Sequence, residues 1–206
     1  EAEAHTQSPP DPMLILELGR LANGYLWNFP KADGCGIGGG AFPGPTVKLI
    51  RSIAADYCRD QGFVWEDCDI CGHPIHVWDG RQRLDGWRCV LAGECASIVD
   101  PLTAEGIRPS LKTGMIAAES VVRALGSSRP SDLSHHTAAV HQEWGADLVW
   151  ARRVARLFYR APEKSFDYLV QRPSATRAFG RVLTGETRYR DVARQAVMKM
   201  TTVLGR

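Results

Sequence analysis

The chain has 206 residues, a formal net charge of +2, and 44% apolar and 23% charged residues. Such a chain can bury the core of one globular domain or two small ones. It contains no apolar run long enough to span a bilayer, and no zinc-finger, RNP or helix-turn-helix signature that would indicate a nucleic-acid partner. Residues 1–12 are polar, carry paired prolines, and do not read as a signal peptide, so we expect a flexible N-terminal segment.

The first half of the chain is predicted to form strands. Three short apolar runs occupy residues 13–18, 24–29 and 35–40. The intervening Asp33-Gly34 pair is a strong hairpin signal. Within the second run, Tyr25, Trp27 and Phe29 alternate along the chain, so a strand would place their rings on one face.

Two further strands and one helix complete this half. A helix is expected from Pro45 to about Gln61, with Gly62 past its end. Strands are expected over residues 69–78 and 87–92, and the second of these should be buried.

From Glu105 the pattern changes to helices. An apolar stripe at helical spacing predicts a core-facing helix, in which Pro109 must lie in the first turn. The residues of this stripe are Ile107, Leu111, Met115, Ala118, Val122 and Leu125. Three more helices are expected at about 131–160, 173–184 and 189–204.

Positive charge is concentrated near the C-terminus. Residues 147–206 contain 13 Lys and Arg and only 5 Asp and Glu. This excess is typical of a solvated helix face. The alternative is attraction to a diphosphate substrate or to an anionic membrane surface, which would make contact with the membrane peripheral.

Residues 91–107 hold the most informative motif. A predicted strand leads into Gly93 and Glu94, a loop contains Pro101, and Gly106 and Ile107 open a helix. A strand end with a carboxylate beside a helix N-terminus suits an acceptor-rich ligand. The stretch resembles the second flavin-binding motif, G-D-A-A-x-x-x-x-P-x-x-G-x-G-I, of flavoproteins like p-hydroxybenzoate hydroxylase, and is most similar to that of geranylgeranyl reductases.

A second motif supports the same resemblance. The segment Tyr25-Leu-Trp27-Asn-Phe29-Pro30, followed by Gly38-Gly39-Gly40, fits the Y-x-W-x-F-P…G-x-G pattern of these reductases. Alternating aromatic rings make a broad apolar wall suited to an isoprenoid chain, and glycines let a backbone approach it closely. Shorter matches occur at residues 72–75, 112–114 and 183–185.

The resemblance implies an FAD-dependent reductase that delivers hydride to an isoprenoid or prenyl-lipid double bond, with its flavin reduced by an external electron donor. The implied cofactor-binding residues are Gly93, Glu94, Pro101, Gly106 and Ile107. The implied substrate-binding residues are Tyr25, Trp27, Phe29, Pro30, Gly38 and Gly40. The resemblance names no catalytic residue.

Two departures from the family pattern stand out. Glu94-Cys95 replaces Asp-Ala, which lengthens the carboxylate by one methylene and puts a thiol beside the cofactor loop. The G-x-G-x-x-G unit that binds the ADP half of FAD is missing, because the glycines of 34–40 follow a turn and no helix begins after them. The chain therefore resembles the C-terminal portion of a reductase that needs an N-terminal FAD-binding segment.

The predicted fold class is α+β. The predicted parts are a flexible segment (1–12), part of a substrate-binding antiparallel sheet domain (13–86), the second FAD-binding motif with its helix (87–126), and a helical C-terminal region (127–206). Two other functions stay open: a flavin monooxygenase or halogenase of the same superfamily, and a flavin-less remnant that binds an apolar ligand or a partner.

Cysteines and histidines suggest no metal site. Cys68, Cys71, His73 and His76 lie close in sequence, but ligands along one strand would alternate faces, so ordinary strand residues are favoured over a metal site or redox dithiol. The six cysteines predict reduced thiols and a cytoplasmic protein. The histidines of the long helix, His135, His136 and His141, are expected at its surface.

Overall fold

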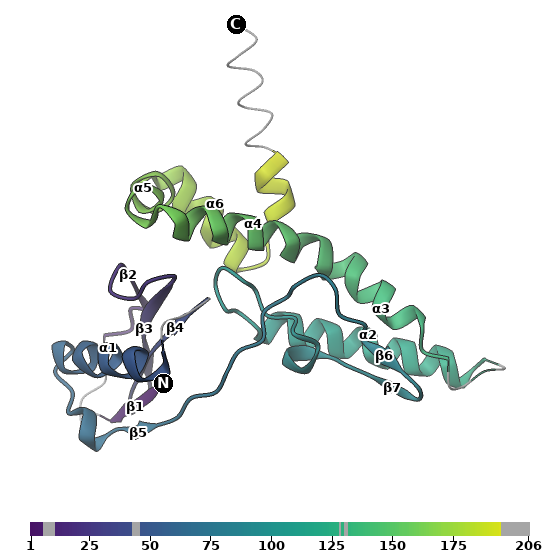
Figure 1. The fold of residues 1–206 in the computed structure, drawn as a ribbon, viewed down its shortest axis with the longest axis horizontal. Coiled ribbons are helices and arrows are strands. Elements are labelled where there is room, and N and C mark those ends of the chain that lie inside the picture. Colours follow the sequence, from purple (N-terminus) through teal and green to yellow (C-terminus); the bar gives the residue numbers. More distant parts are fainter. Residues whose placement is uncertain (6–10, 43–45, 128, 130–131, 195–206) are drawn as a thin grey trace, which may run out of the picture. The chain divides into compact units, whose positions relative to one another are not determined.

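The structure is a computed structural model that describes residues 1–5, 11–42, 46–127, 129 and 132–194 (Figure 1). The chain divides into two compact units, Glu1–Pro74 and Ile75–Arg206. The first unit is a sheet with one α-helix and the short 3-10 helix η1 (Trp65–Asp67), and the second is mainly helical. This mixture of an antiparallel sheet and helices confirms the α+β prediction.

The first unit is built on a five-stranded antiparallel sheet of order β2-β3-β4-β1-β5. Its strands are β1 (Ala2–His5), β2 (Ile15–Leu18), β3 (Gly24–Lys31), β4 (Gly34–Ala41) and β5 (Asp69–Ile70). The hairpin predicted around Asp33-Gly34 is confirmed, since β3 and β4 pair in unbroken register from Gly24 opposite Ala41 to Lys31 opposite Gly34.

Helix α1 (Val47–Asp60) covers one face of this sheet. The Thr46 hydroxyl caps its first turn by accepting from the Leu49 N–H, and Gly62, with φ +86°, follows its end. The predicted start at Pro45 lies outside the described residues. The core between sheet and helix consists of Ala2, Ala4, Leu26, Cys35, Ile37, Ala54, Ala55, Tyr57, Cys58 and Trp65.

The N-terminus differs from the expectation of a flexible segment over residues 1–12. Ala2–His5 form β1, which pairs with β4 on one side and with β5 on the other. Ala2 and Ala4 point into the core, while Glu3 binds the ammonium group of Lys31 in an ion pair. Small apolar residues alternate with charged ones here, so one side of the strand packs into the core and the other faces solvent, although the segment as a whole is polar. Residues 6–10 lie outside the described part.

The second unit begins with a short hairpin, β6 (Asp85–Gly86) and β7 (Cys89–Val90), followed by the 3-10 turn η2 (Gly93–Ala96). Its helices are α2 (Ile107–Leu125), α3 (His135–Val140), the π-helical segment η3 (His141–Gly145), α4 (Ala146–Arg160), α5 (Pro162–Ser165), the π-helical segment η4 (Phe166–Val170) and α6 (Pro173–Leu183). Residues 189–194 are also helical. The rest of the helix predicted to 204 lies outside the described residues.

Two predicted strands are largely wrong. Of residues 69–78, only Asp69–Ile70 form a strand, and Val77 makes one isolated bridge to Val99. Gly72 and Pro74 explain the interruption, because glycine is flexible and proline cannot donate to a sheet ladder. Of residues 87–92, only Cys89–Val90 form a strand, and Trp87 is 81% exposed at the hairpin turn instead of buried.

The apolar stripe of α2 is not the core. Its large residues are exposed, from 58% at Met115 to 78% at Ile107. The buried side of α2 is instead formed by smaller or more polar residues, namely Pro109, Thr113, Ile116, Ser120 and Ala124. Thus α2 packs against α3 and η2 through this second side, and the stripe lies uncovered among the described residues.

The helix histidines are buried or half-buried, not at the surface as predicted. His136 is fully buried, and its Nε2 donates to the Leu91 carbonyl at 2.9 Å while its Nδ1 lies 3.3 Å from the Ser120 hydroxyl. His141 packs edge-on against Trp78 and bonds the Gln82 carbonyl. Helix α3 and the π-helical segment η3 thus hold the segment that contains β6 and β7. Over the described residues, no helix has the length and apolarity needed to cross a membrane.

Candidate functional site

An aromatic wall covers the side of β3 that faces away from α1. Tyr25, Trp27 and Phe29 stand on one side of the strand, with ring centroids 6.0 Å apart for the first pair and 6.2 Å for the second. The residues between them, Leu26 and Asn28, are buried on the other side. The predicted alternation is therefore confirmed, and the sheet presents a row of partly exposed rings.

Glycines on β4 make room for this wall. Gly38 pairs with Trp27 and Gly40 with Tyr25. A Cβ atom at Gly38 would lie 2.4 Å from the Trp27 ring, so the indole rests directly on the glycine backbone. By strand parity Pro30, opposite the core residue Cys35, belongs to the side that faces α1. The structure thus groups five of the six predicted substrate-binding residues and separates Pro30.

The first residue of the predicted cofactor loop, Gly93, is hydrogen-bonded to α2. Gly93, with φ +63°, donates its N–H to the Thr113 hydroxyl at 2.9 Å. Thr113 is fully buried and donates in turn to the Pro109 carbonyl at 2.8 Å. A Cβ atom at Gly93 would lie 3.0 Å from the Ser110 hydroxyl oxygen. Gly93 thus allows η2 to lie against the first turns of α2, and Thr113, which lies in the short match at 112–114, links the two elements.

The loop between η2 and α2 turns around a buried carboxylate. Oδ1 of Asp100 accepts from the N–H groups of Leu102 at 2.7 Å and Thr103 at 3.1 Å, which shapes the chain around the buried Pro101. Burial raises the pKa of Asp100 above its usual range. The neighbouring Tyr189 hydroxyl has a pKa raised by burial and by the Asp100 charge.

The N-terminus of α2 keeps two donors open. The Glu105 carboxylate accepts from the Arg108 N–H at 2.8 Å and caps the first turn. Over the described residues, the N–H groups of Gly106 and Ile107 have no acceptor, and Ile107 is exposed. Unpaired donors at a helix start, with the positive end of the helix dipole, suit an anionic or acceptor-rich group.

Arg108 links the first turn of α2 to residues nearer the C-terminus. Its guanidinium lies over the Trp144 ring, 5.5 Å from the centroid, and donates to the Val182 carbonyl at 3.3 Å. A Cβ atom at Gly185 would collide with this guanidinium. Arg108, Trp144, Val182 and Gly185 line a cavity of about 240 Å³. Charged residues of both signs, among them Asp147 and Arg188, also line it. Gly185 thereby gains a packing role that the short match at 183–185 did not reveal.

Ala104 is a departure from the flavin motif that sequence reasoning missed. It occupies the position of the first glycine in P-x-x-G-x-G-I, and its φ is +55°. A residue with a Cβ atom is disfavoured in this left-handed region. The backbone still adopts the conformation that the motif glycine would adopt freely.

Replacing Ala104 with glycine is expected to stabilise the second unit by about 1 kcal/mol, because the left-handed strain disappears. Urea unfolding of the whole chain measures the change. Ala118→Gly is a matched control on the exposed side of α2, where the same substitution should cost about 1 kcal/mol of helix propensity. Equal losses of unfolding free energy in Ala104→Gly and Ala118→Gly would contradict a left-handed backbone conformation at Ala104.

The cysteine and histidine cluster does not assemble. Cys68 lies 3.8 Å from Cys58, sulfur to sulfur, and burial raises the pKa of the Cys58 thiol to about 12. Cys71, His73 and His76 are exposed. Within the described ranges, no group of three or more His, Cys, Asp or Glu side chains is arranged to hold a metal ion.

No family model matches the chain. It is 34% identical to the digeranylgeranylglycerophospholipid reductase of Methanothrix thermoacetophila over 110 residues, which is 50% of this chain and 27% of that relative. It is 28% identical to the geranylgeranyl diphosphate reductase of Rhodobacter capsulatus over 145 residues, or 68% of this chain and 36% of that relative. The chain therefore spans about a third of the length of these relatives.

The fold has a solved counterpart. The crystal structure of a geranylgeranyl bacteriochlorophyll reductase-like protein from Thermoplasma acidophilum matches 82% of this chain and 45% of its own, with a TM-score of 0.67 and 18% sequence identity. This match supports the fold. Together with the relatives, it confirms the resemblance of this chain to part of the geranylgeranyl reductases.

Proposed function

We propose that this chain is the C-terminal portion of an FAD-dependent reductase of isoprenoid double bonds. One observation carries the proposal: each of the two motifs that resemble the reductases forms a defined structural feature. The first is the aromatic wall on glycines Gly38 and Gly40, and the second is the loop from Gly93 to Ile107 at an open helix start. Relatives named as reductases of geranylgeranyl compounds support this reaction class.

The aromatic wall is proposed to hold the prenyl chain. Tyr25, Trp27 and Phe29 offer contiguous apolar rings without a charged group between them, and Leu16 on β2 pairs with Trp27 and is 46% exposed. An isoprenoid gains free energy by removing such surface from water, about 25 cal/mol per Å². The wall orients the chain by shape alone, which suits a substrate with repeated identical double bonds.

FAD is proposed to lie against the loop 93–107. The unpaired N–H groups of Gly106 and Ile107 would bind an acceptor edge of the flavin, and their helix dipole would stabilise negative charge there. Glu94, Gly93 and Pro101 complete the proposed contacts. When bound, FAD supplies the hydride chemistry, and an external donor is needed to reduce it.

A further FAD-binding segment is proposed to complete the site. The exposed stripe of α2 supports this, because Leu111, Met115 and Val122 lie on one side of the helix. Together they expose more apolar surface than the single apolar residues that are normal on a protein surface. The chain also covers only 27% to 40% of its reductase relatives. A segment that supplies the missing dinucleotide-binding unit, in the same polypeptide or another, would cover this face.

A second candidate is a flavin-less module that binds an apolar ligand or a partner. The strained Ala104 and the longer Glu94 favour it, because both alter the flavin motif. The aromatic wall and the stripe of α2 would then serve binding alone.

The visible absorbance spectrum of the purified chain separates these candidates. The chain is incubated with FAD, with and without the N-terminal segment of the Rhodobacter relative, and free flavin is removed. We expect a retained flavin band only when the segment is present. The complex should then reduce geranylgeranyl diphosphate with dithionite as the electron donor.

The stripe supplies the matched variants. Leu111→Glu with Val122→Glu should abolish retention of the segment, whereas Glu119→Lys, exposed on the same helix, should not. Flavin retained by the chain alone would contradict the need for the segment. No flavin under either condition would overturn the reductase proposal in favour of the binding module.

A further inference from the structure

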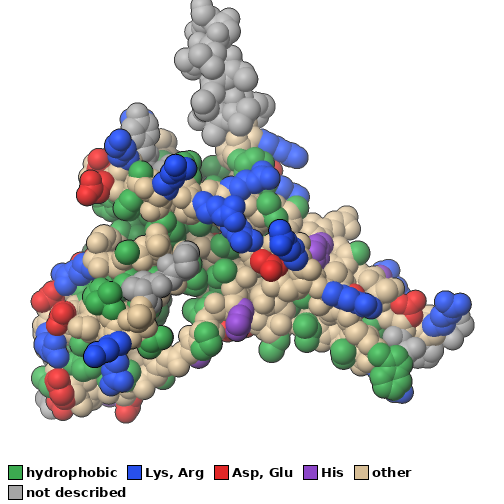
Figure 2. Space-filling view, viewed as in Figure 1, with side chains coloured by type: hydrophobic (Ala, Val, Ile, Leu, Met, Phe, Trp, Pro, Cys, Tyr) green, Lys and Arg blue, Asp and Glu red, His purple; other side chains and the backbone are tan. Residues whose placement is uncertain are grey.

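Three arginines of α4 open onto one cavity in the second unit. Arg152, Arg153 and Arg156 line a hollow of about 220 Å³ together with Trp78, Asp79 and Val149. Figure 2 shows Lys and Arg side chains gathered over α4 and its neighbours. The helix thus concentrates positive charge at a concave site.

These guanidinium groups carry no carboxylate partner. Over the described residues, no Asp or Glu oxygen lies within 4.0 Å of Arg152, Arg153 or Arg156, whereas Arg83 and Arg188 both have such a partner. Arg152 instead donates to the main-chain carbonyl of Asp79 at 3.2 Å. Neutral contacts of this kind position a guanidinium without cancelling its charge.

Two more contacts shape the site. The guanidinium of Arg153 lies over the Trp150 ring, 4.6 Å from its centroid, which holds the side chain in place. The carboxylate of Asp79 accepts from the Arg81 N–H at 2.8 Å, so the one acidic residue of the cavity is bound to main chain. Three positive charges and one negative charge leave the cavity with an excess of two positive charges.

A buried tryptophan forms part of the lining of this cavity. Trp78 is 1% exposed, lines the hollow, and packs against His141, yet its Nε1 has no hydrogen-bond partner within the described part of the chain. The Nε1 atom has less than 1 Å² of accessible surface, so Trp78 shapes the hollow by packing, and its N–H is not open to a ligand there.

We propose that this arginine pocket, defined by Arg152, Arg153 and Arg156, binds a phosphate or diphosphate group. Guanidinium groups match phosphate oxygens with paired hydrogen bonds and stay charged at all relevant pH values. The group belongs either to a soluble diphosphate or to the headgroup of an anionic lipid. The inference stands apart from the proposed reductase activity, since it requires neither flavin nor the aromatic wall.

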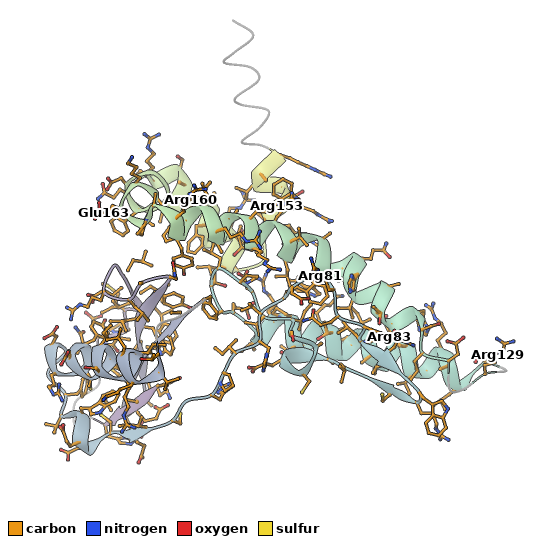
Figure 3. The ribbon with its side chains drawn as sticks, viewed as in Figure 1. Arg81, Arg83, Arg129, Arg153, Arg160 and Glu163 are labelled. Atoms are coloured by element: carbon orange, nitrogen blue, oxygen red, sulfur yellow. The ribbon has the colours of Figure 1, made fainter. Side chains whose placement is uncertain are left out.

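Calorimetric titration of the whole chain with inorganic pyrophosphate at constant ionic strength tests the pocket. The double variant Arg153→Gln with Arg156→Gln should bind pyrophosphate at least about tenfold more weakly, because charge-assisted hydrogen bonds are lost. Arg160→Gln is the matched control, since Arg160 lies on the same helix but outside the lining (Figure 3). It should lose less than about twofold, as expected for a distant screened charge.

A second variant guards against misfolding. Arg153→Lys with Arg156→Lys keeps both positive charges and removes only the paired guanidinium donors, so the fold should survive while pyrophosphate affinity falls severalfold. Circular dichroism of each variant verifies the helices. Equal losses in Arg160→Gln and the double variant would show only general charge attraction and would overturn the pocket. Absence of pyrophosphate and vesicle binding would overturn it as well.

Vesicle sedimentation separates the two sources of phosphate. Phosphatidylcholine vesicles with and without phosphatidic acid are mixed with the chain, and pyrophosphate is then added. Binding to the acidic vesicles that pyrophosphate reverses supports a lipid headgroup in the pocket. Pyrophosphate binding without vesicle binding supports a soluble diphosphate. Vesicle binding that is insensitive to pyrophosphate and to the double variant contradicts the proposal.

Discussion

Gly38→Ala is expected to lower the free energy of unfolding of the first unit by about 1–3 kcal/mol, the usual cost of overpacking. The new Cβ atom would lie 2.4 Å from the Trp27 ring, and the next ring atom is at 2.6 Å. The indole must therefore rotate away or the β3–β4 pair must separate. Either movement breaks the row of rings formed by Tyr25, Trp27 and Phe29.

Hydrogen exchange of the β3 and β4 amides measures this loss, because it reports the local free energy of opening. Gly40→Ala is the control on the same strand and the same face. Its nearest contact would be 3.7 Å from the Trp27 ring, an ordinary packing distance, so exchange should change little. Equal protection in the two variants would show that Trp27 does not rest on Gly38.

His136→Ala is expected to lower the free energy of unfolding of the second unit by about 3 kcal/mol. The substitution leaves a cavity at a fully buried position. It also removes the hydrogen bond to the Leu91 carbonyl, and the loss of such a bond adds about 1 kcal/mol. Since Leu91 directly follows the β6–β7 hairpin, that segment should be the first to open.

Urea unfolding and hydrogen exchange of peptides covering residues 84–92 check this expectation. His135→Ala is the neighbouring control, because His135 is only half-buried and forms none of these bonds. We expect the control to change stability by less than about 1 kcal/mol. If the two alanine variants unfold at the same urea concentration, His136 is not the anchor that the structure indicates.

Local patterns predicted the features that depend on local geometry. The alternation of Tyr25, Trp27 and Phe29 required only a strand period of two, and the structure confirms it. The start of α2 at Ile107 was predictable because Gly106 and Pro109 are typical of a helix N-terminus. These features need no knowledge of distant neighbours.

Features that depend on distant contacts escaped prediction. The stripe of α2 identified an apolar face but not what covers it, and the buried face uses Thr113 and Ser120, whose partners are Gly93 and His136. Strand β1 is held by pairing with strands that begin about thirty or more residues later. In the candidate site, Arg108 and Gly185 likewise matter only because the fold brings them together.

The π-helical segment His141–Gly145 has a consequence for the whole face of α4. A π-helical turn accommodates one residue more than an α-helical turn, and each residue advances an α-helix by about 100°. Each residue of α4 therefore lies at the angular position that the preceding residue would occupy if a regular α-helix continued from α3. A single-residue insertion absorbed in this segment would therefore leave the arginines of α4 on the same side of the helix, whereas the same insertion in a regular α-helix would turn them by about 100°.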